Sequence, residues 1–409
     1  MKICFITNLY PPNVMGGAEL YVEKLVKKIA EDKKQQIIVI TTNQNFSFKI
    51  LVEKKENIKI YRLWPFNLYS LTTKRNYNFI FKLFWHLIDL WNPFVYFTIK
   101  KILKKEKPDL VHTHNLAFLS FSVFSAIKSE KIKLIHTCHD YYPLCPYANL
   151  VCPFSGWRFK KSPPLFCKLY RQITKLILKN KVNIVLMPSK FVMRVYLKNG
   201  FFINSQKIIL PLAPNINLAK NHSHSKQKDE IFKILYVGQL TKAKGIDVLI
   251  KAVKNLKLKV PNLTLTIIGT GKERKKLEKL TGENKNIIFI GRLRPTEIQK
   301  KYQETDVIVI PSLAPETFSL VMFEAMANGK LVIASKIGAL AEYIKDNENG
   351  FLFEPGNIDQ LQKILEKVIH NPLLMEKIGQ NAQKFAQDFT FQKHWKKLEK
   401  IYQSVYCQI

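Results

Sequence analysis

The stretch FKILYVGQLTKAKGIDVLIKAV, residues 232–253, contains one copy of the pattern that decides the fold: an apolar strand, a turn with glycine and an amphipathic helix. The strand is apolar at almost every position, which is typical of a strand buried on both faces of a parallel sheet. The same alternation runs through most of the chain. It predicts doubly wound α/β units.

Apolar, β-branched runs mark the strands of this architecture. They are predicted at residues 2–8, 36–42, 58–63, 109–114, 132–138, 183–189, 207–212, 232–238, 263–269, 286–291, 306–312 and 330–335. The polar, aperiodic segment 213–230 interrupts the alternation and is predicted to be a linker. We therefore expect two Rossmann-like domains, residues 1–212 and 231–385. Parallel sheets bind ligands at the carboxyl ends of their strands, so both domains are expected to face a central cleft.

The chain of 409 residues is strongly basic, with 65 Lys and Arg against 31 Asp and Glu and a formal charge of +34. This charge favours anionic partners: nucleic acid, an acidic membrane surface or a phosphorylated substrate. Only eight of the cations are arginine, the residue best suited to bidentate contacts with guanine, so base readout is disfavoured. We expect a membrane surface and a phosphorylated ligand, and a biased genome is the alternative explanation of the charge.

Residues 76–105 form the most apolar segment, but Lys82, Asp89 and Pro93 interrupt it, so a membrane span is not expected. Its aromatic residues and flanking lysines predict an element that lies on anionic headgroups. Helices packed into an ordinary core are the alternative. The opening residues MKICFITNLYPP do not form a signal sequence, and we expect a cytoplasmic protein that is peripheral on the inner face of the membrane.

Three of the six cysteines, Cys145, Cys152 and Cys167, crowd one loop rich in proline and aromatic residues. The cysteine spacing matches neither a C-x-x-C zinc pair nor a small disulfide scaffold. Reduced thiols are therefore expected, and a metal or a disulfide in this loop stays open.

Two parts of the first domain carry residues suited to phosphate or hydroxyl groups. Gly16 and Gly17 precede a predicted helix, where backbone N–H groups can approach a phosphate closely, although an ordinary loop is the alternative. His114 ends one predicted strand, and His139 and Asp140 end the next. At adjacent strand ends, these side chains could hydrogen-bond sugar hydroxyls or relay a proton.

In the second domain, Lys242 and Lys244 precede Gly245 in the turn after a predicted strand. A lysine there would neutralise a diphosphate as it leaves, although a solvated lysine is the alternative. The segment IIGTGKERKK, residues 267–276, lacks the spacing of a P-loop, so kinase or ATPase chemistry is not expected.

The segment PSLAPETFSLVMFEAMANGK, residues 311–330, sets Glu316 and Glu324 around an apolar patch. Ser319 is predicted to begin a short buried helix whose first N–H groups are directed at a ligand. A carboxylate inside such a helix is costly without a partner, so Glu324 is expected to accept hydrogen bonds from the vicinal hydroxyls of a ribose. Glu316 would meet hydroxyls of a transferred sugar. The alternative is that both glutamates bind protein groups.

With GQLTKAKG, IIGTG and IIFIGRL in the same order, the chain resembles, over nearly its whole length, the retaining glycosyltransferases of glycosyltransferase family 4, which have the GT-B fold. The segment PETFSLVMFE looks like the E-x7-E region of that family. The resemblance implies that Glu324 binds the ribose of a nucleoside diphosphate sugar and that Glu316 contacts its sugar. The other residues that it assigns to the donor and the reacting centre are Gly16, Gly17, Gln239, Lys244, Phe318, Ser319, Leu320 and His114.

Three positions depart from the pattern of the family. Gln239 stands where Arg is common, so Lys244 is expected to carry more of the diphosphate charge, with Lys242 assisting. Ser319 and Ala339 each replace a frequent glycine. Residues 386–409 would, as in the family, include a helix that crosses back to the first domain.

The implied reaction moves a sugar to an acceptor hydroxyl with retention at the anomeric carbon. Because no D-x-D occurs in the chain, we expect neither a divalent metal nor another cofactor. The expected acceptor is a saccharide or a lipid-linked saccharide of cell-surface polysaccharide synthesis, with His139 and Asp140 on the acceptor side.

Other classes of protein stay open. A non-transferring GT-B enzyme such as a sugar-nucleotide 2-epimerase is the nearest alternative, and a basic nucleic-acid-binding protein is another. A dinucleotide-dependent oxidoreductase is disfavoured because no G-x-G-x-x-G follows the first strand.

Overall fold

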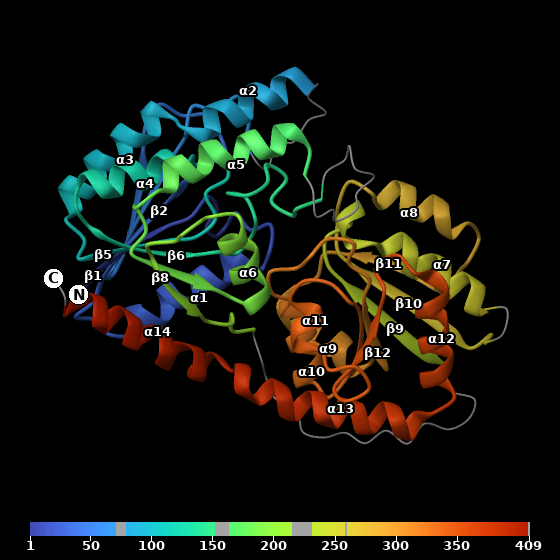
Figure 1. Ribbon diagram of the computed structural model, residues 1–409. Coiled ribbons are helices and arrows are strands. Elements are labelled where there is room, and N and C mark those ends of the chain that lie inside the picture. Colours follow the sequence, from blue (N-terminus) through green and yellow to red (C-terminus); the bar gives the residue numbers. More distant parts are fainter. Residues whose placement is uncertain (71–78, 152–162, 215–230, 258–259, 408–409) are drawn as a thin grey trace. The chain divides into compact units, whose positions relative to one another are not determined.

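The computed structural model describes residues 1–70, 79–151, 163–214, 231–257 and 260–407 (Figure 1). The chain divides into two compact units. Unit 1 consists of Met1–Ala148, Ser162–Pro211 and Trp395–Ile409, and unit 2 consists of Asn149–Lys161 and Leu212–His394. The predicted linker lies almost entirely outside the described residues.

Unit 1 is built on an eight-stranded sheet in the order β3-β4-β2-β1-β5-β6-β7-β8. Its strands are β1 (Lys2–Ile6), β2 (Gln36–Thr42), β3 (Leu51–Lys55), β4 (Ile58–Leu63), β5 (Leu110–Thr113), β6 (Lys133–Thr137), β7 (Ile184–Met187) and β8 (Gln206–Ile209). All neighbours pair in parallel except β3 and β4, which are antiparallel. The sequence did not predict β3, because this edge strand is mostly exposed and carries three charged residues.

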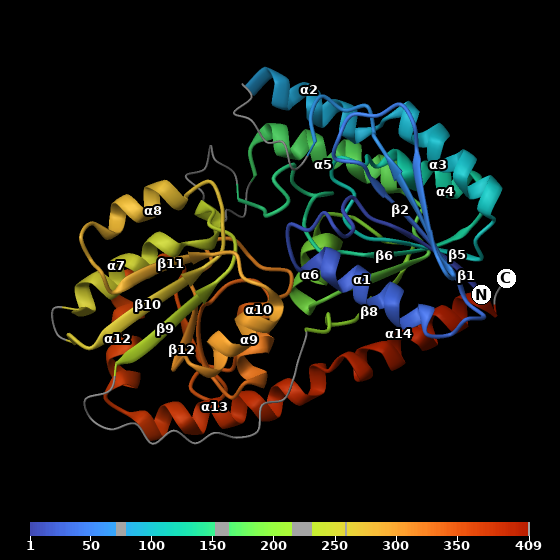
Figure 2. The same ribbon diagram turned by 180° about the vertical axis from the view of Figure 1, so that it is seen from behind.

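Helices cover both faces of this sheet. They are α1 (Gly17–Ala30), α2 (Phe79–Leu90), α3 (Pro93–Glu106), α4 (Ser122–Ser129), α5 (Leu165–Leu178), α6 (Lys190–Lys198) and, from Trp395 on, α14 (Phe391–Tyr406). Figures 1 and 2 show α3, α4 and α5 on one face, with α1 and this part of α14 on the other. Ser189 caps α6 by accepting a hydrogen bond from Val192 N–H at 3.3 Å, as the sequence predicts.

Unit 2 is built on a six-stranded parallel sheet in the order β11-β10-β9-β12-β13-β14. Its strands are β9 (Phe232–Val237), β10 (Leu263–Ile268), β11 (Ile287–Gly291), β12 (Val307–Ile310), β13 (Leu331–Ser335) and β14 (Phe351–Phe353). Its helices are η2 (Lys242–Lys244), α7 (Ile246–Lys257), α8 (Arg274–Thr281), α9 (Pro295–Gln303), α10 (Leu320–Ala327), α11 (Leu340–Tyr343), α12 (Ile358–Ile369), α13 (Pro372–Ala386) and η3 (Gln387–Phe389). β14 was not predicted, because a strand of three residues is too short to show a pattern.

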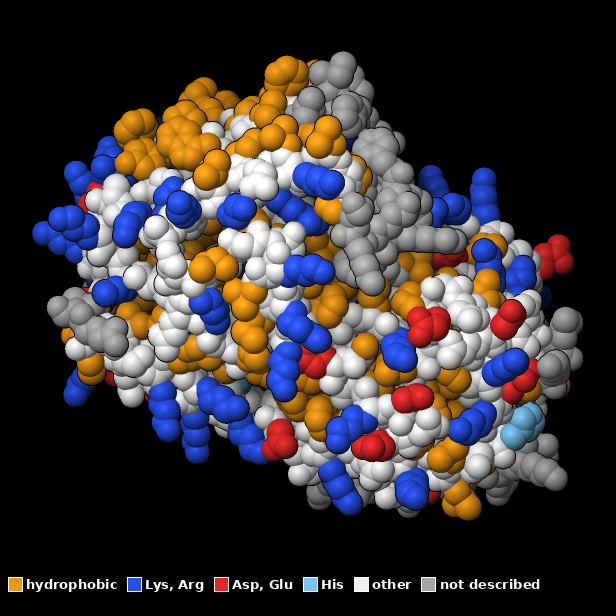
Figure 3. All heavy atoms as spheres, in the orientation of Figure 1, with side chains coloured by type: hydrophobic (Ala, Val, Ile, Leu, Met, Phe, Trp, Pro, Cys, Tyr) orange, Lys and Arg blue, Asp and Glu red, His pale blue; other side chains and the backbone are white. Residues whose placement is uncertain are grey.

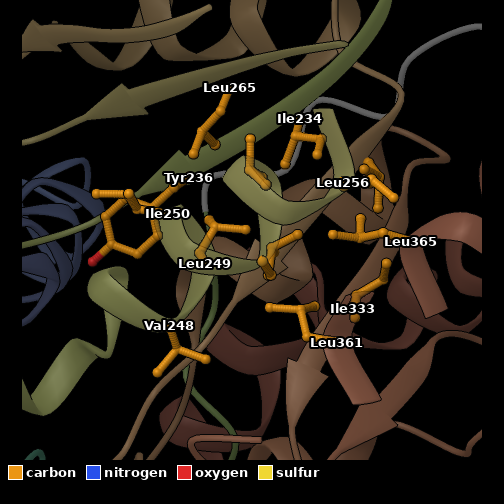
Figure 4. Packing of buried hydrophobic residues seen from close by; sticks show 14 of the residues in the cluster. Ile234, Tyr236, Val248, Leu249, Ile250, Leu256, Leu265, Ile333, Leu361 and Leu365 are labelled. Atoms are coloured by element: carbon orange, nitrogen blue, oxygen red, sulfur yellow. The ribbon is translucent and has the colours of Figure 1, made fainter. Parts of the chain in front are cut away.

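The core of unit 2 lies between its sheet and the helices α7 and α12. Figure 4 shows Ile234 and Leu265 of the strands facing Leu249 of α7, with Leu361 and Leu365 of α12 beside them. Burying such side chains gives about 25 cal/mol per Å² of apolar surface, and this holds the strand ends in place. The structure thus has two doubly wound α/β units, which confirms the predicted fold class.

Candidate active site

In unit 2, the turn with the predicted lysines and the loop after β12 are packed together. The Ala243 carbonyl in the turn accepts a hydrogen bond from Leu313 N–H in the loop at 2.8 Å. Gly245 ends the turn with a φ of +63°, and a Cβ there would lie only 2.0 Å from the Pro311 carbonyl oxygen. Because a side chain does not fit, glycine allows the two backbones to meet.

Glu316, in the loop after β12, is held by two side chains. Lys244 Nζ lies 2.8 Å from Glu316 Oε1, and Ser312 Oγ donates a hydrogen bond to the same oxygen at 2.6 Å. The Glu316 side chain is 11% exposed, so the lysine offsets much of the cost of burying its charge. The Glu316 carbonyl accepts a hydrogen bond from Ala339 N–H at 2.9 Å, and a Cβ at Gly338 would lie 2.6 Å from Glu316 N. Both ends of this residue are therefore fixed.

The predicted short helix is α10, and its start follows the sequence. Ser319 is the N-cap and accepts a hydrogen bond from Met322 N–H at 3.4 Å, and Leu320 is the first helical residue. Phe318, just before the cap, stacks on Phe323 with ring centroids 4.6 Å apart. This stacking fixes the segment from which the first N–H groups of the helix project.

Glu324 has a protein partner that the sequence did not reveal. Tyr302 OH donates a hydrogen bond to Glu324 Oε2 at 3.0 Å. Burial and the nearby carboxylate raise the pKa of Tyr302 well above its ordinary value, so it stays a donor. Both glutamates therefore bind protein groups, which was the alternative weighed from the sequence. Tyr302 lies 22 positions before Glu324 in the chain, so no local sequence pattern indicates this contact.

A buried tyrosine supports the loop that carries Gln239. Tyr236 OH donates a hydrogen bond to the Gln239 carbonyl at 3.0 Å. Burial, with a smaller effect of Glu316, raises the pKa of Tyr236 well above its ordinary value. Gln239 itself is exposed, and Lys242 is half-buried in the turn beside it. Tyr236 and Ser312 were missed because each lies in an apolar run that was interpreted only as a strand.

In unit 1, the predicted histidines meet at the ends of two paired strands. His114 follows β5 and His139 follows β6, and these strands are neighbours. His114 Nδ1 lies 2.8 Å from His139 Nε2, and Phe5 stacks on the His114 ring. Burial, followed by the neighbouring histidines, lowers the pKa of His114 well below its ordinary value. His114 is therefore neutral near pH 7, and its buried Nε2 has no hydrogen-bond partner among the described residues.

A second histidine on β5 supports this arrangement. The His112 ring lies 4.2 Å from the His114 ring, centroid to centroid, as expected for alternate residues of one strand. His112 Nδ1 lies 2.7 Å from Tyr402 OH of α14, and its Nε2 lies 2.7 Å from Thr137 Oγ1. Both ring nitrogens of His112 are thus engaged, so its role is to hold the strand end.

The remaining predicted residues of unit 1 lie near the same sheet edge. Asp140 is half-buried and accepts a hydrogen bond from Tyr142 N–H at 2.8 Å, and burial raises its pKa to about 6. Gly16 and Gly17 stand at the start of α1, where Gly16 N–H donates to Glu19 Oε2 at 2.7 Å. A phosphate at Gly16 would therefore compete with a carboxylate of the chain itself.

The structure groups no three His, Cys, Asp or Glu side chains of the described residues as a metal site would require. Cys145 and Cys167 are buried, and Cys152 lies outside the described residues. The metal-independent reaction therefore stays a prediction.

Two family models match most of the chain. Residues 15–209 match Glycosyltransferase Family 4, and residues 219–385 match Glycosyl transferases group 1. Among curated proteins, the chain is 28% identical to an uncharacterized 42.6 kDa protein in the cps region of Klebsiella pneumoniae, over 87% of this chain and 90% of the relative. It is 27% identical to an uncharacterized glycosyltransferase of Methanocaldococcus jannaschii, over 94% of this chain and 93% of the relative.

Solved structures share the fold over the full length. Sucrose-phosphate synthase of Thermosynechococcus elongatus has a TM-score of 0.77 at 20% identity and covers 100% of both chains. HepE of Anabaena in complex with UDP-glucose has a TM-score of 0.70 at 19% identity, over 99% of this chain and 100% of that chain. These solved structures have the GT-B fold, and this chain therefore has the GT-B fold as well.

Proposed function

We propose that this chain, a glycosyltransferase with the GT-B fold, binds a nucleoside diphosphate sugar in unit 2 and transfers the sugar to an acceptor hydroxyl with retention at the anomeric carbon. The proposal rests on the contact between Lys244 Nζ and Glu316 Oε1, which lie 2.8 Å apart. Glu316 lies just before the helix α10, which carries Glu324. The structurally similar protein HepE was solved in complex with UDP-glucose, which supports this class of donor.

The diphosphate would be bound by Lys244 and by the start of α10. A lysine has three N–H donors, and its bond to Glu316 uses one of them, so the other two remain for phosphate oxygens. The first N–H groups of α10 and the dipole of the helix favour negative charge at the same end. The backbone of Phe318, Ser319 and Leu320 would then contact phosphate and sugar groups.

The two carboxylates would bind the two ends of the donor. Glu324, oriented by Tyr302, would accept hydrogen bonds from the ribose hydroxyls. Glu316 would accept hydrogen bonds from the transferred sugar while its other contacts fix its position. Carboxylates accept only, and a diol supplies two donors, so the chemistry matches.

In the transfer step, the bond between the anomeric carbon and the diphosphate oxygen breaks, and the acceptor oxygen forms a bond on the same face. The hydroxyl proton passes to the departing diphosphate, whose charge Lys244 and the α10 N–H groups stabilise. In unit 1, the Nε2 of His114, which has no hydrogen-bond partner among the described residues, would bind a sugar hydroxyl. This step needs no divalent metal, so turnover should persist in excess EDTA.

A thermal-shift screen with UDP-, GDP- and ADP-sugars tests donor binding. A ligand that binds only the native state raises the melting temperature. We expect one nucleotide class to stabilise the protein, and no response to any of them would contradict the proposal. Incubation with donor alone separates the alternatives, because a 2-epimerase would convert the donor without an acceptor.

We further propose that the acceptor is a lipid-linked saccharide and that unit 1 lies on the inner face of a membrane. Large apolar side chains are exposed on α2, α3 and α5, and Figure 3 shows them gathered over α2 and α3. They include Phe81, Phe84, Phe94, Phe97 and Leu169, each between 36% and 67% exposed. A helix that is apolar on its exposed side as well as on its buried side is typical of a binding surface. Exposed lysines on the same helices would favour a membrane with anionic headgroups.

Vesicle sedimentation tests this surface. The protein should bind anionic vesicles more tightly than neutral ones, and Phe97→Asp on α3 should weaken binding at least fivefold. Leu373→Asp in unit 2 is the matched control, since Leu373 is 79% exposed on α13. Equal effects of the two variants would argue against a specific face. No helix within the described residues has the length and apolarity to span a bilayer.

A further inference from the structure

Two histidines of unit 1 share one hydrogen bond between their rings. His114 Nδ1 lies 2.8 Å from His139 Nε2, so one of these two nitrogens carries a hydrogen that the other accepts. His114 is neutral near neutral pH, because burial lowers its pKa. A neutral imidazole has a single N–H. The direction of the bond to His139 therefore decides whether His114 Nε2 is a donor or an acceptor.

Burial favours one of the two directions. His114 is 1% exposed, and its Nε2 has no hydrogen-bond partner among the described residues. If His139 donated the bond, His114 would carry its hydrogen on that Nε2, and a buried N–H without an acceptor is costly. If His114 Nδ1–H donates to His139 Nε2, no N–H of His114 is left unbonded. The second direction is therefore favoured for His114.

Neighbouring rings hold the two histidines in this geometry. Phe5 stacks on His114 with ring centroids 5.9 Å apart. Tyr21 lies edge-on to both histidines, at 6.0 Å from the His114 ring and 5.4 Å from the His139 ring. The His112 ring lies 4.2 Å from the His114 ring. Neither histidine can turn its nitrogen away without displacing these neighbours, so the contact is preorganised.

We infer that His139 is a positioning residue: it accepts the hydrogen bond from His114 Nδ1–H and thereby keeps His114 Nε2 as a hydrogen-bond acceptor. An acceptor there pairs with the hydrogen of a hydroxyl group and not with an oxygen of a phosphate or carboxylate. The inference rests on the proposed function, in which this Nε2 binds a sugar hydroxyl. It adds the residue that fixes the direction of that hydrogen bond.

Nitrogen-15 NMR of the full chain without ligand tests the tautomer directly. The nine histidines would be labelled, and the His114 signals would be identified by their loss in His114→Asn. Protonated and bare ring nitrogens differ clearly in chemical shift. We expect His114 to show a protonated Nδ1 and a bare Nε2. A protonated Nε2, or an even mixture of the two forms, would overturn the inference.

Variants test whether His139 sets this tautomer. His139→Phe keeps a ring but removes the acceptor, so His114 should shift towards the form with hydrogen on Nε2. His139→Leu replaces this variant if the larger ring prevents folding. His139→Gln offers a carbonyl oxygen near the position of Nε2, so the Nδ1–H form should persist. An unchanged tautomer without the acceptor would overturn the inference.

His136→Gln is the matched control. His136 is a buried histidine of β6 whose Nδ1 lies 2.9 Å from Thr113 Oγ1. Its replacement should leave the His114 signals unchanged. If it altered them as much as His139→Phe does, the effect would be a general disturbance of the strands, and the inference would fail.

Kinetics of sugar transfer give a second readout. In His139→Phe, kcat should fall about three- to tenfold, because His114 Nε2 no longer stays an acceptor. The donor KM should change less than about twofold, because the proposed donor contacts lie in unit 2. His139→Gln should restore most of kcat, a rescue that a purely structural role would not predict.

The two readouts separate failure of this inference from failure of the proposed function. The tautomer is measured without ligand, so it does not depend on the proposed reaction. Absence of transfer from every nucleotide sugar would overturn the proposed function and leave the tautomer result in place. An unchanged kcat in His139→Phe, in a protein that does transfer sugar, would overturn the role of His139 in the reaction.

Discussion

The two units place their candidate residues at the same kind of sheet edge, but unit 2 has an ion pair there and unit 1 has buried groups that favour their neutral form. In unit 2, the Glu316 side chain is 11% exposed and lies 2.8 Å from the Lys244 ammonium group. In unit 1, two buried groups favour their neutral form: burial lowers the pKa of His114 and raises the pKa of Asp89 on α2 to about 7. The comparison teaches that the fold alone does not set the ligand. A charged edge suits a diphosphate, and an uncharged edge suits hydroxyl groups.

The largest expected effect follows from removing the cation of the charged edge. Lys244→Met should lower kcat/KM by about 10²- to 10³-fold, because it removes a group that stabilises the leaving diphosphate. Lys242→Met is the matched control in the same turn and should cost less than about tenfold. Steady-state kinetics of the two variants decide this, and equal losses would mean that only general positive charge matters.

The uncharged edge can be tested through pH. The folded-state pKa of Asp89 is raised from 3.8 to about 7, so the folded protein binds more protons than the unfolded chain between these values. Its contribution to stability is present below about pH 4 and is lost as the pH rises through 7. The stability of the unchanged protein relative to Asp89→Asn should therefore fall by roughly 3 kcal/mol between pH 4 and pH 7.

Urea titrations of both proteins measure this difference. The pKa values of His86 and His136 are lowered to about 4, which gives the opposite slope below pH 6.5, but both histidines are present in the two proteins and cancel. A difference that does not change with pH would show that Asp89 ionises normally.

The packing of the charged edge predicts a difference between two glycines. Gly338 has a φ of +62°, and a Cβ there would meet Glu316 N at 2.6 Å, whereas Gly329 has a φ of +68° and a Cβ there would lie 3.8 Å from its nearest neighbour, Gln383. Gly329→Ala should cost about 1–2 kcal/mol, the cost of the left-handed backbone alone. Gly338→Ala should cost more and should also weaken donor binding. Thermal melts with and without donor check both statements, and equal melting temperatures would remove the argument for close packing.

The smallest effect is expected at the support of Glu324. Tyr302→Phe removes the hydrogen bond to Glu324 Oε2 and keeps the ring. A hydrogen bond of this kind contributes about 0.5–1.5 kcal/mol, so the donor KM should rise about two- to tenfold. If Tyr302→Phe raised the donor KM more than Glu324→Ala does, the proposal that Tyr302 acts by orienting Glu324 would be contradicted.

The same comparison explains how far the sequence could be interpreted. Most of the parallel strands were predictable because their sequences form apolar runs, and all those predicted appear in the two sheets, whereas the three-residue strand β14 was missed. Ser319 and α10 were predictable because capping is local. β3 was not, because its exposed residues lack an apolar pattern.

Side-chain partners were less predictable than the elements that carry them. The Lys244–Glu316 contact joins residues 72 positions apart, and only a resemblance placed both in one site. The partner of Glu324 had no such pattern. It depends on how segments distant in the sequence pack, which neither periodicity nor spacing encodes.

Donor binding by the charged edge is the central claim, and calorimetric titration tests it most directly. The nucleotide sugar that stabilises the protein would be titrated into the unchanged protein, Glu324→Ala and the control Glu348→Ala, which changes an exposed glutamate of the same unit. We predict that Glu324→Ala weakens binding at least tenfold, whereas Glu348→Ala changes affinity less than twofold. Unchanged donor affinity in Glu324→Ala would contradict the account.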